Sequence, residues 1–168
     1  MKQSVQSGGW AKISLFPIGL AGLVLVVALA VNLAGPPYNA ESVRIAEASQ
    51  LVTLARNAYS TEDWLGARDY ASQALALNPN HVSAHIILGL SYLNVNAFDL
   101  AETEFRQVLA VAKQDRNSLA WAHNNLGVVY QRRGQLEIAR QEYETALEVD
   151  PSNVQARLNL SLIQTAVP

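Results

Sequence analysis

The sequence contains no cysteine and few charged residues, and both absences restrict what the protein can do. Without Cys the chain can form no disulfide, no thiolate nucleophile, no Cys-ligated zinc site and no lipid-modified Cys anchor. Charged residues make up 15% of the 168 residues and hydrophobic residues 50%, which is apolar for a soluble domain. The sequence also has no Gly-rich phosphate loop and no nucleophile elbow. We therefore expect neither an enzyme nor a bound cofactor.

The charges that are present lie almost entirely after residue 40. All fourteen Asp and Glu lie there, with ten of the twelve Lys and Arg, because only Lys2 and Lys12 precede that point. Ten minus fourteen gives this part of the chain a net charge of −4. Nucleic-acid binding depends on a basic face that neutralises phosphates. Nucleic acid is therefore not an expected partner.

One apolar run without any charge, residues 13–34, has the length of a membrane span. Its 22 residues match the roughly 20 that a helix needs to cross a hydrocarbon core of about 30 Å. Gly35-Pro36-Pro37 follows and ends the helix, because proline lacks the backbone donor and disfavours helical geometry before it. We expect a transmembrane helix or uncleaved signal anchor over 13–34, after a tail over 1–12. Residues 35–47 form a linker and the start of the next helix.

A cleaved signal peptide is the alternative for this segment. Ala28-Leu29-Ala30 has the small-x-small pattern of a cleavage site, but the apolar run continues beyond it and is long for a signal-peptide core. Orientation depends on one charge. Two lysines precede the run and Arg44 follows closely, which favours a cytoplasmic N-terminus and places the rest of the chain on the non-cytoplasmic side.

The remainder of the chain repeats itself. Ala67 and Ala101 are 34 residues apart, and Ala101 and Ala139 are 38 apart, which predicts a four-residue insertion near 111–118. We expect that insertion to be an irregular surface loop. The third copy is the most regular, and its characteristic positions are Leu126, Gly127, Tyr130, Gly134, Leu136, Ala139, Tyr143, Ala146 and Pro151.

This pattern resembles the tetratricopeptide repeat, a helix–turn–helix unit of 34 residues. The segment AWAHNNLGVVYQRRGQLEIARQEYETALEVDPSN matches nearly every characteristic position. The resemblance implies an all-α chain, in which the N-terminal transmembrane helix is followed by an α-solenoid of three helix pairs and a C-terminal capping helix. The expected repeats are 48–81, 82–119 with the insertion, and 120–153, with the capping helix over 154–168. The expected helices are 40–60, 63–77, 81–95, 97–112, 117–133, 135–148 and 151–166.

By analogy with the family, the first helix of each pair lines a concave groove that binds a partner. Family members that clamp a C-terminal carboxylate need paired Lys and Arg there, where this sequence has Val52, Ile86 and Trp121. We expect instead a protein or peptide segment with an apolar face, and no small-molecule substrate. Leu158 and Leu162 continue the surface on the capping helix. The predicted groove residues are Val52, Arg56, Tyr59, Ile86, Leu90, Leu93, Trp121, Asn124, Asn125, Val128, Gln131 and Asn159.

Three groups of residues allow two interpretations each. Asn125 and Asn159 either hold a peptide backbone as rungs of a ladder or satisfy their bonds within their own helix pairs. Trp121 is either a binding anchor on the concave face or a core residue. His81 and His85 are spaced to share a metal on a helix, but no third ligand stands nearby. A buried, hydrogen-bonded histidine is favoured, so no metal site is expected.

The layout of one anchor followed by about three repeats looks like the membrane-bound factors that assist photosystem I assembly in cyanobacteria and plastids. The resemblance implies a membrane-tethered scaffold for assembly of a membrane protein complex, in a bacterial inner membrane or a thylakoid. A pilus or cell-envelope assembly factor has a similar layout. A secreted or periplasmic binding module is the alternative if the N-terminal segment is cleaved as a signal peptide, and a subunit whose groove is filled by another chain is a third.

Overall fold

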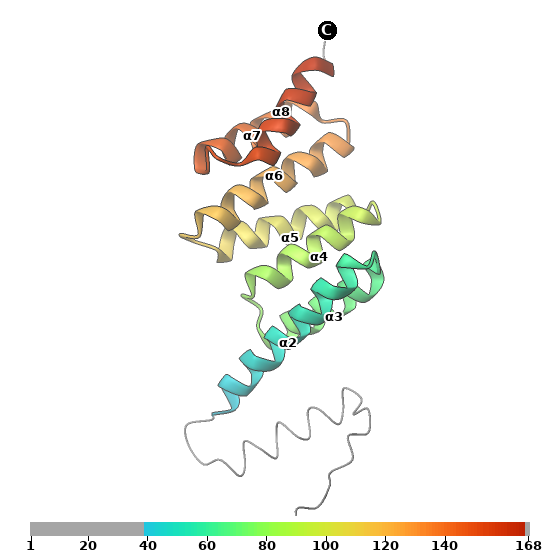
Figure 1. Ribbon diagram of the computed structural model, residues 1–168, viewed down its shortest axis with the longest axis vertical. Helices are drawn as coiled ribbons and strands as arrows, with labels where there is room; N and C mark the ends of the chain where they lie inside the picture. The colour runs from blue at the N-terminus through green and yellow to red at the C-terminus, as the bar shows by residue number, and fades with distance from the viewer. Residues whose placement is uncertain (1–38, 167–168) are drawn as a thin grey trace, which may run out of the picture. The chain divides into compact units, whose positions relative to one another are not determined.

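The computed structural model describes residues 39–166, and this range folds into seven α-helices without a strand (Figure 1). All seven predicted helices are present, and their ends agree with the prediction to within three residues. The all-α class and the solenoid of helix pairs are therefore confirmed. The helices are α2 (Ala40–Ser60), α3 (Trp64–Leu77), α4 (Val82–Asn94), α5 (Phe98–Val111), α6 (Arg116–Arg132), α7 (Leu136–Val149) and α8 (Val154–Ala166).

The predicted membrane segment, residues 13–34, lies outside the described residues. Among the helices of 39–166, none is long and apolar enough to cross a membrane. The chain divides between Val43 and Arg44 into two compact units, and the helices from Arg44 onward belong to the second unit.

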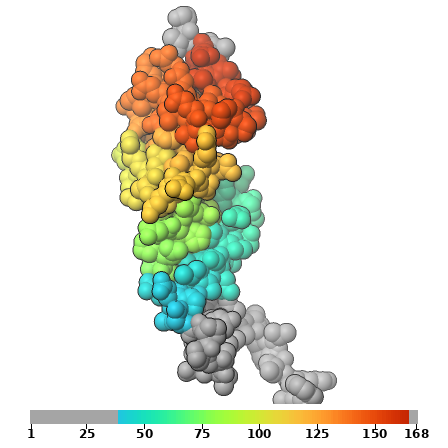
Figure 2. Space-filling model, turned by 90° about the vertical axis from the view of Figure 1, so that its left-hand side faces the viewer, coloured from blue at the N-terminus to red at the C-terminus, as the bar shows by residue number. Residues whose placement is uncertain are grey.

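Helices of the second unit pack mainly against their neighbours in sequence. α4 packs on α5, α6 on α7, and α8 on α7, while α3 and α5 contact the first helix of the next pair. The successive colours of Figure 2 accordingly follow one another along the stack. Such a solenoid buries its core between consecutive units. One core cluster joins α2, α3 and α4, and a second joins the helices from α4 to α8.

Residue sizes within each pair explain how closely its two helices approach. In the second and third pairs a glycine of the first helix faces a ring of the second: Gly89 faces Phe105, and Gly127 faces Tyr143. In the first pair both positions are occupied by fully buried alanines, Ala55 and Ala71. An aromatic ring faces a glycine in two pairs, and two alanines occupy these positions in the first pair. In each pair the combined volume of the two side chains therefore stays small enough for the helices to pack closely.

The insertion is not the irregular loop that we expected. The three connections between pairs, residues 78–81, 112–115 and 150–153, all have the same length, whereas α6 has 17 residues and α4 has 13. The four extra residues therefore add about one helical turn to the start of α6. Asp115 caps this turn by accepting a hydrogen bond from the Ser118 amide at 3.3 Å, which favours continuation of the helix over a loop.

Candidate protein-binding face

The first helices, α2, α4, α6 and α8, lie next to one another and form what we call the first-helix layer. α4 contacts α6, and α6 contacts α8. Two hydrogen bonds join neighbouring members: Asn94 donates to the Tyr59 hydroxyl at 3.0 Å, and Asn159 donates to the Asn124 side-chain oxygen at 3.0 Å. Residues about 35 positions apart in sequence thus meet along one face of the stack.

The predicted groove residues divide into two sets according to burial. Val52, Leu93, Asn124 and Asn125 are buried, and the first two belong to the core clusters. Arg56 is exposed, whereas the others are half-buried and open to a partner: Tyr59, Ile86, Leu90, Trp121, Val128, Gln131 and Asn159. Binding by this set stays a prediction.

The uncharged polar residues of the predicted groove have partners inside the protein. Asn125 donates to the Trp121 carbonyl of its own helix at 2.8 Å. The side-chain amide of Asn159 donates to the side-chain oxygen of Asn124 on α6. Gln131 accepts a hydrogen bond from the Tyr143 hydroxyl at 2.7 Å. Asn125 thus bonds within its own helix, as one of its two interpretations states, whereas Asn159 bonds to α6 and not within its own helix pair.

Trp121 combines features of both of its interpretations. Its ring meets the Phe105 ring edge-on, with centroids 5.8 Å apart and planes at 73°. This geometry is favourable for an aromatic pair and fixes the indole against the preceding helix pair. The side chain nevertheless stays half-buried, so part of its surface is open to solvent.

α8 exposes apolar side chains on the first-helix layer and polar side chains elsewhere. Leu158 and Leu162 are 51% and 52% exposed. Arg157, Ser161 and Gln164 are exposed as well. Arg157 and Ser161 stand 34 positions after His123 and Gly127, two residues with which α6 packs on α7. The side of α8 that corresponds to the α7-facing side of α6 is thus polar, so it can face water without a further second helix packed on it. Leu158 itself stands 34 positions after Asn124, whose side chain is bonded to α8, so the two leucines lie on the side of α8 that corresponds to the contact between successive first helices.

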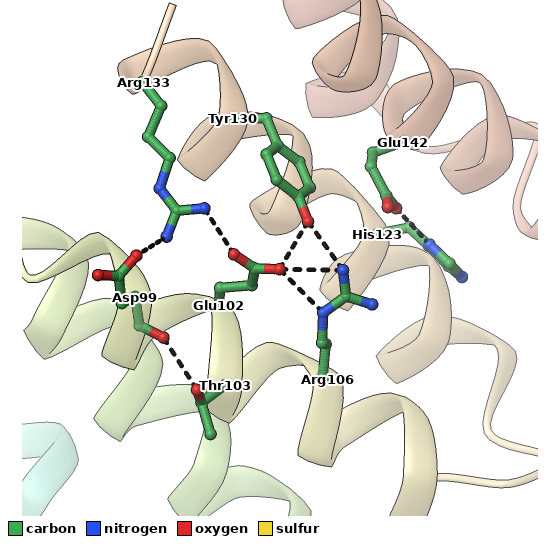
Figure 3. Close-up of polar contacts among 8 residues, drawn as sticks. All are labelled: Asp99, Glu102, Thr103, Arg106, His123, Tyr130, Arg133 and Glu142. Carbon is green, nitrogen blue, oxygen red and sulfur yellow. Dashed lines mark hydrogen bonds and ion pairs between the residues drawn. The ribbon is translucent and has the colours of Figure 1, made fainter. Parts of the chain in front are cut away.

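A polar network connects the second and third helix pairs on the side of α5 (Figure 3). Glu102 lies at its centre, accepting hydrogen bonds from the Tyr130 hydroxyl at 2.7 Å and from Arg106 at 3.0 Å, and pairing with Arg133. Arg133 also pairs with Asp99. Partial burial opposes ionisation of Glu102, but the bonds from Tyr130, Arg133 and Arg106 outweigh it and lower the pKa of Glu102 to about 2. The carboxylate of Glu102 therefore stays charged at neutral pH, and its bonds to Tyr130 and Arg133 link the second helix pair to the third.

Two histidines occupy equivalent positions in the second and third pairs, each with a glutamate of the following helix. His85 Nδ1 lies 2.7 Å from Glu104, and His123 Nδ1 lies 2.8 Å from Glu142. The Nε2 atom of His85 lies 2.9 Å from the Pro79 carbonyl oxygen. Burial alone would lower the pKa of His85, but these two acceptors outweigh it and raise that pKa.

With both ring nitrogens engaged, His85 has no lone pair for a metal ion. Among the described residues no group of three or more His, Cys, Asp or Glu could hold a metal. His85 is thus a buried, hydrogen-bonded histidine, as the favoured interpretation states.

Sequence reasoning missed one exposed residue of the first-helix layer, Arg132. It follows Trp121, Asn125 and Val128 at helical spacing and is exposed. The sequence did carry a relevant pattern, because no Asp or Glu occurs in 48–60, 82–94, 116–132 or 154–166.

Comparison with known proteins identifies the repeat. The family described as tetratricopeptide repeat matches residues 80–152. Protein O-mannosyl-transferase F38B6.6 of Caenorhabditis elegans is 30% identical over 96 residues, and the uncharacterised protein ycf37 of Cyanophora paradoxa is 32% identical over 72 residues. These matches cover 57% and 43% of this chain, but only 13% and 42% of the two relatives.

Solved structures agree on the fold. The first tetratricopeptide domain of Spaghetti (RPAP3), solved with an HSP90 peptide of sequence SRMEEVD, superimposes with a TM-score of 0.65 at 20% identity. The superposition covers 73% of this chain and 94% of that one. The pairing of a glycine with a ring recurs in two successive helix pairs, and residues 80–152 of this chain match the family described as tetratricopeptide repeat.

Proposed function

We propose that this protein is a membrane-tethered scaffold that binds an apolar segment of a partner protein on its first-helix layer and assists assembly of a membrane protein complex. The observation that carries the proposal is the pair of half-exposed leucines on α8, Leu158 and Leu162. They stand beside a polar face of the same helix and extend a row of half-buried apolar side chains on α4 and α6.

The apolar row supplies a binding free energy that water contacts do not. Fully burying a leucine is worth about 1.5–3 kcal/mol relative to leaving it exposed. Covering the exposed halves of Leu158 and Leu162 would therefore contribute about 2 kcal/mol together. Leu90, Val128 and Trp121 add further partly exposed surface, and the indole is already held by Phe105, so little entropy is lost when a partner covers it.

The nature of this face argues against one ligand type within the family. The Spaghetti domain binds an HSP90 peptide, whereas a clamp for a C-terminal carboxylate would need paired Lys and Arg at positions that here are Val52, Ile86 and Trp121. Val52 is buried and Ile86 is half-buried among apolar neighbours. An apolar helix or extended segment suits these positions better.

Tethering follows from residues 13–34, whose 22 uncharged positions suit a single membrane span. A tether raises the effective concentration of a modest binding face near membrane partners. The non-cytoplasmic side of a bacterial inner membrane or a thylakoid is the location we propose for the repeats. A photosystem is the complex whose assembly factors have this layout, and a pilus or cell-envelope complex is the alternative.

The alternative of a soluble module with its leader removed has a direct test. A retained anchor predicts a full-length chain that pellets with membranes and begins at Met1. A mature protein that begins near Val31 would show that the anchor is cleaved.

Site-specific crosslinking tests the binding face itself. A photoreactive amino acid at Leu90 or Leu158 in native membranes should give the same discrete adduct with one partner. The same probe at Leu100, which is 50% exposed on α5, should give none. Adducts that form at Leu100 and not at Leu90 or Leu158 would place the binding surface on the second helices and contradict the proposal.

A further inference from the structure

Charges in the repeat unit are segregated between the two helix layers. The second helices α3, α5 and α7 carry eight Asp and Glu against three Arg. From Arg44 onward the first helices α2, α4, α6 and α8 carry five Arg against one acidic residue, Glu47. Glu47 lies before the first expected repeat. The repeats themselves therefore have no carboxylate on any first helix.

Three of the five first-helix arginines have structural partners. Arg44 donates to the Leu77 carbonyl at 3.3 Å, Arg116 to the Val149 carbonyl at 3.1 Å, and Arg157 to the Pro151 carbonyl. Each of these three carbonyl groups lies at the end of a second helix or in the turn after it. Cations there satisfy carbonyl groups that the helix leaves unpaired.

The guanidinium groups of the other two, Arg56 and Arg132, make no hydrogen bond or ion pair within residues 39–164. Both are exposed. The next residue, Arg133, differs, because it pairs with Asp99 and Glu102 on the second helix α5. No acidic residue stands three or four positions away from Arg56 or Arg132 on the same helix to form a local pair.

Apolar surface separates these two arginines along the stack. Arg56 belongs to the first pair and Arg132 to the third. The second pair stands between them and contributes Leu90, which is half-buried, and Val128 lies one turn before Arg132. A segment laid across the pairs would meet a cation, an apolar stretch and a second cation.

From this arrangement we infer that the first-helix layer binds a segment whose apolar stretch is flanked by acidic side chains, one facing Arg56 and the other facing Arg132. The inference rests on the proposed function and names the chemistry of the partner. Charge complementarity of this kind adds selectivity, because a segment with basic flanks would meet two unpaired cations. It also speeds encounter with an acidic segment.

Two short synthetic peptides with the same apolar centre, one flanked by Glu and the other by Gln, test the inference. Their affinities for the full-length protein in nonionic detergent are measured by fluorescence anisotropy. An exposed ion pair is worth about 0.2–1 kcal/mol, so each pair should change affinity by about 1.4- to 5-fold. The Glu-flanked peptide should bind more tightly by about 2- to 25-fold, and the difference should shrink at high salt.

Matched variants assign the effect to the two arginines. Arg56→Gln and Arg132→Gln should each weaken the Glu-flanked peptide by about 1.4- to 5-fold and leave the Gln-flanked peptide unchanged. Arg140→Gln is the control, because Arg140 is an exposed arginine of α7 on the second-helix layer. It should change neither affinity.

The outcomes separate this inference from the function on which it rests. Equal affinities for the two peptides, both weakened by Leu158→Gln, would overturn the inference and support binding on the apolar face. An Arg140→Gln effect as large as that of Arg56→Gln would overturn it as a nonspecific charge effect. Failure of both peptides to bind would contradict the inference and the proposed apolar binding face together.

Discussion

Gly127 and Tyr143 are packed so closely that no side chain fits between them. A Cβ atom built on Gly127 would lie 2.5 Å from Cε1 of Tyr143, and one on Gly89 would lie 2.5 Å from Cε1 of Phe105. Tyr143 and Phe105 are fully buried, so neither ring has free space to move into. The approach of first and second helix in these pairs therefore depends on the absence of one methyl group.

Gly127→Ala should destabilise the fold by about 2 kcal/mol, because overpacking a tight core costs about 1–3 kcal/mol. In a Tyr143→Ala background the same change should stabilise by about 1 kcal/mol, because alanine is the better helix former once the ring is gone. Urea unfolding followed by circular dichroism gives both values. The alanine pair of Ala55 and Ala71 shows that the fold accepts this combination. A Gly127→Ala cost that is the same in both backgrounds would contradict steric contact as its cause.

The turns between the two helices of each pair should respond oppositely to glycine and alanine. Glu62, Asn96 and Gly134 occupy these turns with φ of 62°, 59° and 77°, a region that costs a residue with a side chain about 1–2 kcal/mol. Glu62→Gly should therefore stabilise by up to about 1 kcal/mol, and Gly134→Ala should destabilise by about 1 kcal/mol. A Cβ on Gly134 meets nothing within 4 Å, so steric contact cannot explain a loss there. Thermal unfolding of both variants checks the signs, and the same sign for both would refute the account.

Stability should fall as pH rises through the pKa of His85. Because its pKa in the folded state is raised above the ordinary value of 6.5, the imidazolium stabilises the fold fully below about pH 6.5 and loses this contribution as pH rises through the raised pKa. Burial of the ring lowers this pKa, and Glu104 and the Pro79 carbonyl outweigh the burial and raise it. Melting temperatures measured from about pH 6 to about pH 8 should decline in the wild type and decline less in His85→Gln. Equal declines would assign the effect to other groups.

Glu102→Gln should destabilise the fold by about 2 kcal/mol, because hydrogen bonds to a charged group contribute about 1.5–3 kcal/mol. The pKa of Glu102 is lowered from 4.5 to about 2, so this contribution is present above pH 4.5 and is lost as pH falls toward 2. Chemical unfolding at neutral and acidic pH tests both statements. Glu137→Gln, an exposed change on α7, is the control and should stay within about 0.5 kcal/mol of wild type. Equal losses for Glu102→Gln and Glu137→Gln would contradict a central role for Glu102.

The helices were predictable because repeat positions such as Gly127, Ala139 and Pro151 recur at fixed spacing and each has a local structural role. The insertion was located correctly but its shape was not. Whether extra residues form a loop or a turn of helix depends on the Asp115 cap and on the Arg116 bond to the Val149 carbonyl, which joins residues 33 positions apart.

The binding face was predictable as a stripe of residues, but the exposure of each member was not. Leu93 was expected in the groove and is buried in the core between pairs. Its burial depends on how α5 and α6 pack around it, which spacing along one helix does not determine. The bond between Asn159 and Asn124 likewise depends on the register of α6 against α8.

Leu158 and Leu100 allow the most direct test of the central claim, that the first-helix layer binds the partner. They are 51% and 50% exposed but lie on α8 and α5, in different layers. The measurement is the amount of partner that co-purifies with full-length protein from detergent-solubilised membranes, compared among wild type, Leu158→Gln and Leu100→Gln. The account predicts that Leu158→Gln lowers partner recovery several-fold, as expected for the loss of about 1–2 kcal/mol, and that Leu100→Gln leaves it unchanged. Equal recovery with Leu158→Gln and wild type, or loss with Leu100→Gln alone, would contradict it.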